Sequence, residues 1–204
     1  MPNLNDFTAV AKEYGFKKDD WYRPTTGESK VRVLSGEFEV LAKHWIQSLK
    51  KTFVCYGQDE GCPYDTEIVD QTTGKKRMVH KPGVKYLFWV IDRVDEKIKI
   101  GELPYTVAQK IAELKSSEEY GFETSPAYDI IIKKTKTGPN STDVEYTVIP
   151  SRKDTPLTPD EIKGFEEKES LVDIVEKMKS KEKNKQSSIP VAVDGNAEEE
   201  DILK

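Results

Sequence analysis

The sequence predicts a mainly β fold, a small five-stranded barrel with flanking helices. Several segments alternate apolar and polar residues with a period of two, which is typical of strands. One segment between them has apolar residues at helical spacing, and two further strand-like segments follow it. A chain of 204 residues has room for one such domain with extensions.

The first 20 residues predict a short amphipathic helix or arm. Apolar residues recur there at helical spacing, and Gly15 follows as a stop signal. These apolar positions are Leu4, Phe7, Val10, Ala11 and Tyr14. The predicted core, residues 21–156, begins after this arm.

Strand signals and one helix signal fill the core. The most apolar segment, 85–93, is expected to form a hairpin with 97–103 across a polar turn. Residues 105–116 predict the single helix. The expected strands are 30–34, 37–47, 52–56, 85–93, 97–103, 128–134 and 144–149.

An unusually long connection interrupts the strands. Residues 57–83 are rich in Gly, Asp, Thr and Lys, and a loop of this length is uncommon unless it has a function or a local staple. We therefore expect residues 52–83 to form an inserted subdomain.

The C-terminal quarter has a different character. Pro150 is expected to end the last strand, and Thr158, Pro159 and Glu161 together form a strong helix start. We expect one helix over 157–181. Residues 182–204 are poor in aromatic residues and rich in charge, which predicts a disordered acidic tail.

This order of elements fits the oligonucleotide-binding (OB) fold, a partly open Greek-key barrel of five strands. It also fits several other small barrels. The fold prediction is therefore a five-stranded OB-fold barrel with an inserted loop subdomain, flanking helices and a disordered acidic C-terminal tail.

Charge is distributed unevenly along the chain. The net charge of −5 divides into −1 for residues 1–29, +2 for 30–153 and −6 for 154–204. Residues 71–85 hold several cations and no acid, so they can create a local positive field or simply form a solvated loop. The acidic total therefore does not exclude a nucleic-acid partner.

Several classes of protein are disfavoured. The sequence has no run of about 18 apolar residues, so we expect no membrane-spanning helix. The N-terminus lacks an apolar signal region, and two cysteines do not make a disulfide framework, which predicts a cytoplasmic location. No P-loop, G-x-S-x-G or H-E-x-x-H motif is present, so we expect no enzyme activity.

Spaced positions in the core resemble phage-type single-stranded DNA-binding proteins, the family that includes the helix-destabilising proteins of T-even phages. The string W-Y-R-P-x-x-G-x-x-K-V-R-V-L from Trp21 to Leu34 resembles the first strand of that family. The segments 42–45 (AKHW), 129–132 (DIII) and 146–150 (YTVIP) resemble later positions. The resemblance covers roughly residues 20–160 and implies an OB fold whose cleft holds single-stranded DNA without sequence preference.

The resemblance also implies a zinc site in the inserted subdomain. In the family, a His, a Cys and a Cys-x-x-Cys hold the metal. The matching positions here are His44, Cys55, Cys62 and Asp65, and Asp65 replaces the last Cys. A carboxylate can ligate zinc, and His80 is a possible substitute ligand. The alternative is that zinc has been lost and both cysteines are ordinary packed residues.

Single-stranded DNA binding needs cations for phosphates and aromatic faces for bases. The chain supplies both in alternating strand positions. We expect Tyr56 or Tyr64 to stack on bases, although large aromatic residues in strands are often core. The candidate DNA-binding residues are Arg32, Lys43, Trp45, Tyr56, Tyr64, Lys75, Lys76, Arg77, Lys85, Trp89 and Arg93.

The C-terminal end resembles the acidic tips of single-stranded DNA-binding proteins. Such a tip can compete with DNA for a basic groove or dock on a replication or recombination protein. It can also be a solubilising tail. The residues concerned are Glu198, Glu199, Glu200, Asp201, Ile202 and Leu203.

Together these features predict a non-catalytic protein that binds and protects single-stranded DNA during phage-type replication, recombination or repair. If it is phage-encoded, its location is the cytoplasm of the bacterial host. The N-terminal arm is expected to allow self-association on DNA. The alternative is an OB-fold adaptor that binds proteins and has no direct role with nucleic acid.

Overall fold

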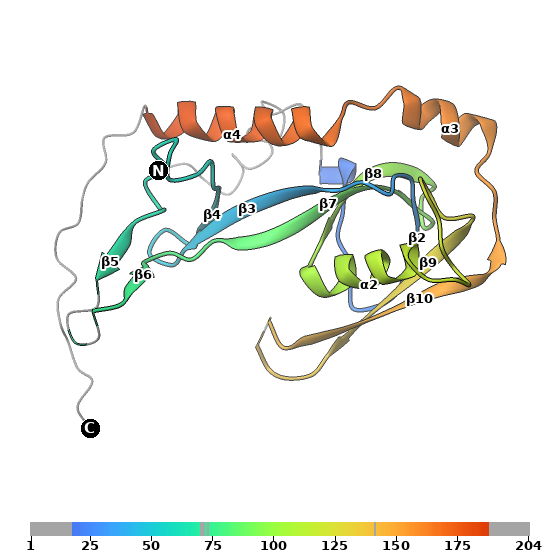
Figure 1. Cartoon of the computed structure of the whole chain (residues 1–204), viewed down its shortest axis with the longest axis horizontal. Coiled ribbons are helices and arrows are strands. Elements are labelled where there is room, and N and C mark those ends of the chain that lie inside the picture. Colours follow the sequence, from blue (N-terminus) through green and yellow to red (C-terminus); the bar gives the residue numbers. More distant parts are fainter. Residues whose placement is uncertain (1–17, 70–71, 73, 141, 188–204) are drawn as a thin grey trace.

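The computed structural model describes residues 18–69, 72, 74–140 and 142–187 (Figure 1). This part of the chain is mainly β, with one mixed sheet of eight strands, a separate two-stranded hairpin and three α-helices. The predicted N-terminal helix and the acidic tip at 198–203 lie outside the described residues.

The elements follow one another in an order close to the predicted one. The strands are β1 (Trp21–Tyr22), β2 (Gly27–Val33), β3 (Glu39–Ile46), β4 (Lys51–Val54), β5 (Glu67–Val69), β6 (Lys76–Met78), β7 (Gly83–Asp92), β8 (Lys97–Leu103), β9 (Tyr128–Lys136) and β10 (Val144–Asp154). The helices are α2 (Tyr105–Lys115), α3 (Pro159–Glu166) and α4 (Leu171–Ser187). No helix in the described part of the chain is long and apolar enough to cross a membrane.

Strand β7 connects the two halves of the sheet. Its first half pairs with β3, and its second half pairs with β2. The main path of the sheet is β1-β8-β7-β2-β9-β10, with β1 parallel to β8. The described strands do not close into a ring, because β8 pairs with β1 and β7 and not with β10.

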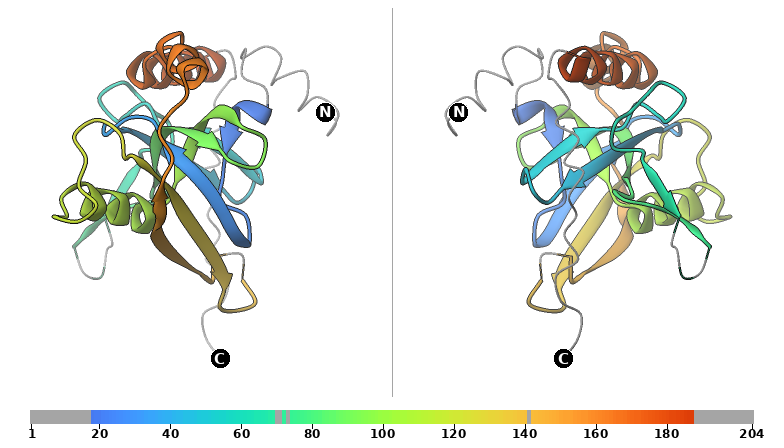
Figure 2. Two further views of the ribbon diagram at one scale, coloured as in Figure 1. Left: turned by 90° about the vertical axis from the view of Figure 1, so that its right-hand side faces the viewer. Right: turned by 90° about the vertical axis from the view of Figure 1, so that its left-hand side faces the viewer.

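The sheet buries two apolar faces, one against α2 and one against α4. Figure 2 shows these two helices on different sides of the strands. On the first, which we call the α2 face, Val107 and Ile111 of α2 pack against Val31, Phe88 and Ile130. The opposite side, which we call the α4 face, packs Leu171, Ile174 and Val175 of α4. Its sheet residues are Leu34, Leu41, Leu87, Trp89, Ile91 and Ile100.

A buried ion cluster joins the two ends of the core sequence. Asp129 in β9 is 2% exposed and contacts Lys30 at 3.2 Å, Arg32 at 2.9 Å and Arg93 at 3.1 Å. Arg93 also pairs with Glu161 of α3 at 2.5 Å. The cluster thus fastens β2, β9, the turn after β7 and α3 to one another.

Strand periodicity correctly located the main ladder, but several ends differ. The loop expected over 57–83 contains the hairpin β5–β6. The last strand continues past Pro150, which pairs opposite Ile130 just before a register irregularity. Proline is tolerated there because β10 is an edge strand.

The C-terminal region has two helices where we expected one. Thr158 caps α3 in a full capping box with Glu161, as expected. The helix ends at Glu166, and Ser170 then caps α4 by accepting a hydrogen bond from the Asp173 backbone. Helix α4 continues to residue 187, so the expected disorder does not begin at 182.

Replacing Asp129 by Asn should lower the free energy of unfolding by about 3–5 kcal/mol, because Arg32 would keep its buried charge without a counter-charge. Urea unfolding at pH 7 measures this. The matched control is Glu28→Gln in an exposed pair with Lys133, which should change it by less than about 0.5 kcal/mol. A loss below about 1 kcal/mol for Asp129→Asn would contradict the prediction.

The same ion cluster predicts that the free energy of unfolding falls at acid pH. Burial acts to raise the pKa of Asp129, but the hydrogen bond to Lys30 and the charges of Arg32 and Arg93 outweigh it and lower the pKa. This stabilisation is complete above the unfolded pKa of about 4 and is lost as the pH falls through the lower folded pKa. Urea unfolding between pH 5 and pH 2 should show a smaller acid loss for Asp129→Asn than for the parent chain.

Candidate functional site

Four potential metal ligands converge in the inserted subdomain. His44 lies in β3, Cys55 directly follows β4, and Cys62 and Asp65 lie in the loop before β5. All four are buried, and their ligand atoms lie within 4.8 Å of one another. The structure therefore gathers the four residues at which the family resemblance placed the ligands.

Two tight turns produce this convergence. Gly57 and Gly61 have positive φ values of 97° and 78°, which favour glycine. Between them the chain reverses, so that the Cys62 backbone N–H donates to the Gly57 carbonyl at 3.0 Å. The reversal returns Cys62 to the side of Cys55.

The His44 imidazole is oriented as a metal ligand requires. Its Nδ1 donates to the His80 carbonyl at 2.7 Å, which leaves Nε2 as the atom with the lone pair. That Nε2 is fully buried, has no hydrogen-bond partner, and lies 3.3 Å from an Asp65 carboxylate oxygen. A second nitrogen held by a backbone carbonyl is the usual support of a metal-bound histidine.

Cys55 is protonated in this cluster. The Cys55 thiol donates to Asp65 Oδ2 at 3.0 Å. Burial, followed by this hydrogen bond, raises the pKa of Cys55 to about 12. A metal would have to displace that proton, since the thiolate is the ligand. One nitrogen, two sulfurs and one carboxylate form a donor set that fits a tetrahedral metal ion.

The expected substitute ligand, His80, has a different role. It contributes its backbone carbonyl to His44, and its ring lies edge-on to Tyr64 at a centroid distance of 6.4 Å. The group of converging ligand atoms includes Asp65 and does not include the His80 side chain.

The cluster is also tied to the C-terminal helix. Tyr56, next to Cys55, donates a buried hydrogen bond of 2.8 Å to the Gln186 side chain of α4. Lys183 of α4 pairs with Glu60 in the same loop at 2.5 Å. Tyr56 is therefore occupied in packing, and its 9% exposure leaves no face for a base.

Three of the predicted DNA-binding residues lie on the α4 face of the sheet, namely Lys43, Trp45 and Lys85. Leu41 packs under α4, and Lys43 and Trp45 follow it at two-residue steps in β3. Lys85 is the direct partner of Leu41 in β7 and lies on the same face. Trp45 is 53% exposed.

Lys43 is less available than Trp45. Its side chain is 16% exposed and pairs with Glu102 at 3.0 Å. Burial lowers the pKa of Lys43, although Glu102 opposes this shift. Arg23, which is not among the predicted DNA-binding residues, is 66% exposed and pairs with the same Glu102 at 2.6 Å. The place of Arg23 in the Trp-Tyr-Arg-Pro string was the sequence signal that could have identified it.

The predicted basic run forms an exposed hairpin strand. Lys75, Lys76 and Arg77 are exposed at or beside β6, and Lys76 pairs with Glu67 across the hairpin at 3.4 Å. The chain then leads directly into β7. Tyr64 is half-buried, and its ring packs on Phe53 at 4.8 Å.

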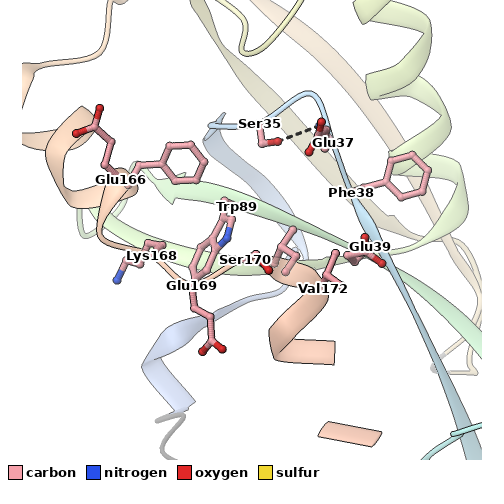
Figure 3. Close-up of a pocket in the computed structure, with 12 residues that line it drawn as sticks. Ser35, Glu37, Phe38, Glu39, Trp89, Glu166, Lys168, Glu169, Ser170 and Val172 are labelled. Atoms are coloured by element: carbon pink, nitrogen blue, oxygen red, sulfur yellow. Dashed lines mark hydrogen bonds between the residues drawn. The ribbon is translucent and has the colours of Figure 1, made fainter. Parts of the chain in front are cut away.

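Other predicted residues are buried and do not agree with the expected cleft. Arg32 is fully buried against Asp129, and Arg93 is enclosed by Asp129, Glu96 and Glu161. Trp89 is 8% exposed at the base of a pocket between the β2–β3 and α3–α4 connections (Figure 3). Carboxylates surround that pocket, which disfavours a phosphate: Glu37, Glu39, Glu166 and Glu169.

The cluster of four potential metal ligands, the basic strand and the exposed β3 residues all belong to one part of the molecule. We call this part the arm and define it as residues 39–87, from β3 to the first half of β7. In Figure 1 the arm extends away from the rest of the sheet, with α4 above it. Compared with protein-family models, curated proteins and solved structures, the chain matches none.

Burial of both thiols, together with the raised pKa of Cys55, predicts that the native protein resists alkylation. Cys55 and Cys62 are 8% and 5% exposed, and the thiolate is the reactive form. Iodoacetamide at pH 8 followed by mass measurement should leave the native protein unmodified over a period in which a urea-unfolded, chelator-treated sample gains two labels. Rapid double labelling of the native protein would contradict the described cluster.

Proposed function

We propose that this protein binds single-stranded DNA without sequence preference and has no catalytic role. The observation that carries the proposal is the acid-free stretch 71–85, whose described part includes β6 and the start of β7, where Gly83 pairs with Lys43; exposed Trp45 follows Lys43 two residues later in β3. Cations supply sequence-independent affinity for phosphates, and an exposed indole can stack on any base.

The strand order supports an OB fold. Five strands lie in the order β8-β7-β2-β9-β10, with α2 between β8 and β9 in the chain. The meander β2-β7-β8, followed by a helix and a returning hairpin beside β2, is the order of the five-stranded OB barrel. In this assignment β3 prolongs β2, and the arm is an insertion between the first and second barrel strands.

The arm has a small positive excess, because residues 39–87 contain eight Lys and Arg and six Asp and Glu. Glu67 compensates Lys76, and Glu102, outside the arm, is shared by Lys43 and Arg23. Lys85 and Arg77 add to this positive charge. A field of this sign on one part of an acidic chain attracts a polyanion to that part.

We also propose that the four-donor cluster holds a structural zinc ion. The buried Nε2 of His44, which makes no hydrogen bond and faces the Asp65 carboxylate, supports this assignment, because a buried polar atom without a hydrogen bond is costly unless it has a ligand. His44, Cys55, Cys62 and Asp65 would hold the metal, which would supply folding free energy to the arm.

Oligo-dT titration with a fluorescent label tests DNA binding. Reversing Lys75, Lys76 and Arg77 together to Glu should weaken binding by about 10- to 100-fold and make the salt dependence shallower, because fewer counterions are released. The matched control reverses the exposed Lys97, Lys110 and Lys163, which changes the net charge equally and should have a much smaller effect.

An unchanged affinity and salt slope in the arm variant would refute the role of β6. Binding that is micromolar or weaker, insensitive to salt and no better for oligo-dT than for duplex DNA would refute the proposed function. That outcome would favour the protein-binding adaptor.

Metal analysis tests the zinc proposal. Protein purified without added zinc should carry about one equivalent, and His44→Ala should lose it. The control His80→Ala should retain the metal, because only the backbone of His80 supports the site. Less than about 0.2 equivalents in the parent chain would overturn the assignment.

A further inference from the structure

Few aromatic side chains of the described residues are exposed enough to meet a base. They are Phe38 at 46%, Trp45 at 53% and Tyr105 at 59%. Trp45 lies on the α4 face. Phe38 and Tyr105 belong to a different surface, because both contact Tyr86, which lies on the α2 face.

Phe38, Tyr86 and Tyr105 form a row. The ring centroids are 5.5 Å apart for Phe38 and Tyr86, and 6.0 Å apart for Tyr86 and Tyr105. Val40 pairs with Tyr86 across the β3–β7 ladder, and Val84 lies two residues before Tyr86. Each of these valines is 43% exposed and extends the row along the arm. We call these five residues the aromatic platform.

Secondary structure holds the platform in place. Tyr86 is in the middle of β7, Tyr105 is the first residue of α2, and Phe38 directly precedes β3. The Phe38 ring also rests on buried Phe88 at 5.6 Å. In Figure 3 the Phe38 ring lies on the other side of strand β3 from Trp89. Rings fixed in this way lose little conformational entropy when a ligand stacks on them.

No charge on the platform itself repels a polyanion, because none of its five residues is charged. Phe38 lines the Trp89 pocket together with its neighbours Glu37 and Glu39, but Glu39 pairs with Leu87 and so lies on the α4 face of β3. Lys85 lies between Val84 and Tyr86 in β7. The last residue of β8, Leu103, pairs with Tyr86, so among the described strands β8 does not extend to Lys85. A strand of nucleic acid held at Lys85 can therefore continue over this edge onto the platform.

We propose that the aromatic platform is the base-stacking surface for single-stranded DNA. The proposal rests on the DNA-binding function above and deepens it, because it assigns stacking to Phe38 and Tyr105, with half-buried Tyr86 between them, in place of Tyr56 or Tyr64. The phosphates remain with Lys85 and the cations of β6. The platform then contributes an affinity that depends on the presence of bases and not on salt.

The test compares two ligands of equal length, oligo-dT and the same chain made entirely of abasic sites. In the parent protein, oligo-dT should bind at least tenfold more tightly than the abasic chain. Phe38→Ala and Tyr105→Ala should each weaken oligo-dT binding by about tenfold and leave its salt slope unchanged. Abasic-chain affinity should not change in either variant.

Controls separate stacking from general loss of structure. Val94→Ala removes a side chain that is 82% exposed in the turn after β7, at the opposite end of that strand from Tyr86, and should not alter binding. Because Phe38 also touches Phe88, crosslinking of the parent protein to 5-iodouracil-substituted oligo-dT provides a second measurement. Crosslinks should map to Phe38, Tyr86 or Tyr105.

The outcomes distinguish the two proposals. Tight, salt-dependent oligo-dT binding that is unchanged in Phe38→Ala and Tyr105→Ala, or crosslinks confined to Trp45, would overturn the platform and leave the DNA-binding function standing. Equal affinity for oligo-dT and the abasic chain would also overturn the platform. A parent protein that binds neither ligand would overturn both.

Discussion

The burial of Arg32 is the constraint on which the rest of the core depends. A fully buried guanidinium is stable only with a counter-charge, and Asp129 supplies it from a strand almost 100 residues later. Asp129 also holds Arg93, and Arg93 holds Glu161, which is part of the cap of α3. One network of ion pairs thereby specifies three features of the core. They are the pairing of β2 with β9, the position of the turn after β7, and the start of α3.

Strand β7 connects the arm to the core that this network holds in place. Its C-terminal half lies beside β2 in the fixed core, and its N-terminal half carries β3 and, through β3, β4 and the cluster of metal-ligand residues. A continuous strand of ten residues is stiff, so the arm has a defined direction relative to the core. The same strand presents Lys85 on one face and Tyr86 on the other, which places a cation and an aromatic ring at one edge.

The sequence was sufficient for the parts that depend on local pattern. The period of two located β7 and β8, and the capping residues at Thr158 located α3. The proposed ligand set His44, Cys55, Cys62 and Asp65 converges in the fold, although the resemblance and not the spacing selected it.

The errors share a physical cause. Alternation assigns a residue to a face of a strand, but it does not say what covers that face. Trp89 and Tyr56 were expected at a surface, and both are covered by elements more than 70 residues later in the chain, the α3–α4 connection and Gln186. Arg32 was predicted to bind phosphate because its partner Asp129 is also far away in the sequence, so their ion pair could not be foreseen. Phe38 and Tyr105 were missed because each is an isolated aromatic residue at the start of an element.

Helix α4 also determines how the protein can be shortened. A chain that ended before Leu171 would expose the apolar α4 face to water, including Leu41, Leu87 and Ile91, which are fully buried in the described fold. A contiguous apolar surface of that kind promotes self-association and loss of solubility. A chain that ended after residue 187 would keep this cover and the contact of Gln186 with Tyr56. The acidic C-terminal residues can therefore be removed cleanly only beyond the end of this helix.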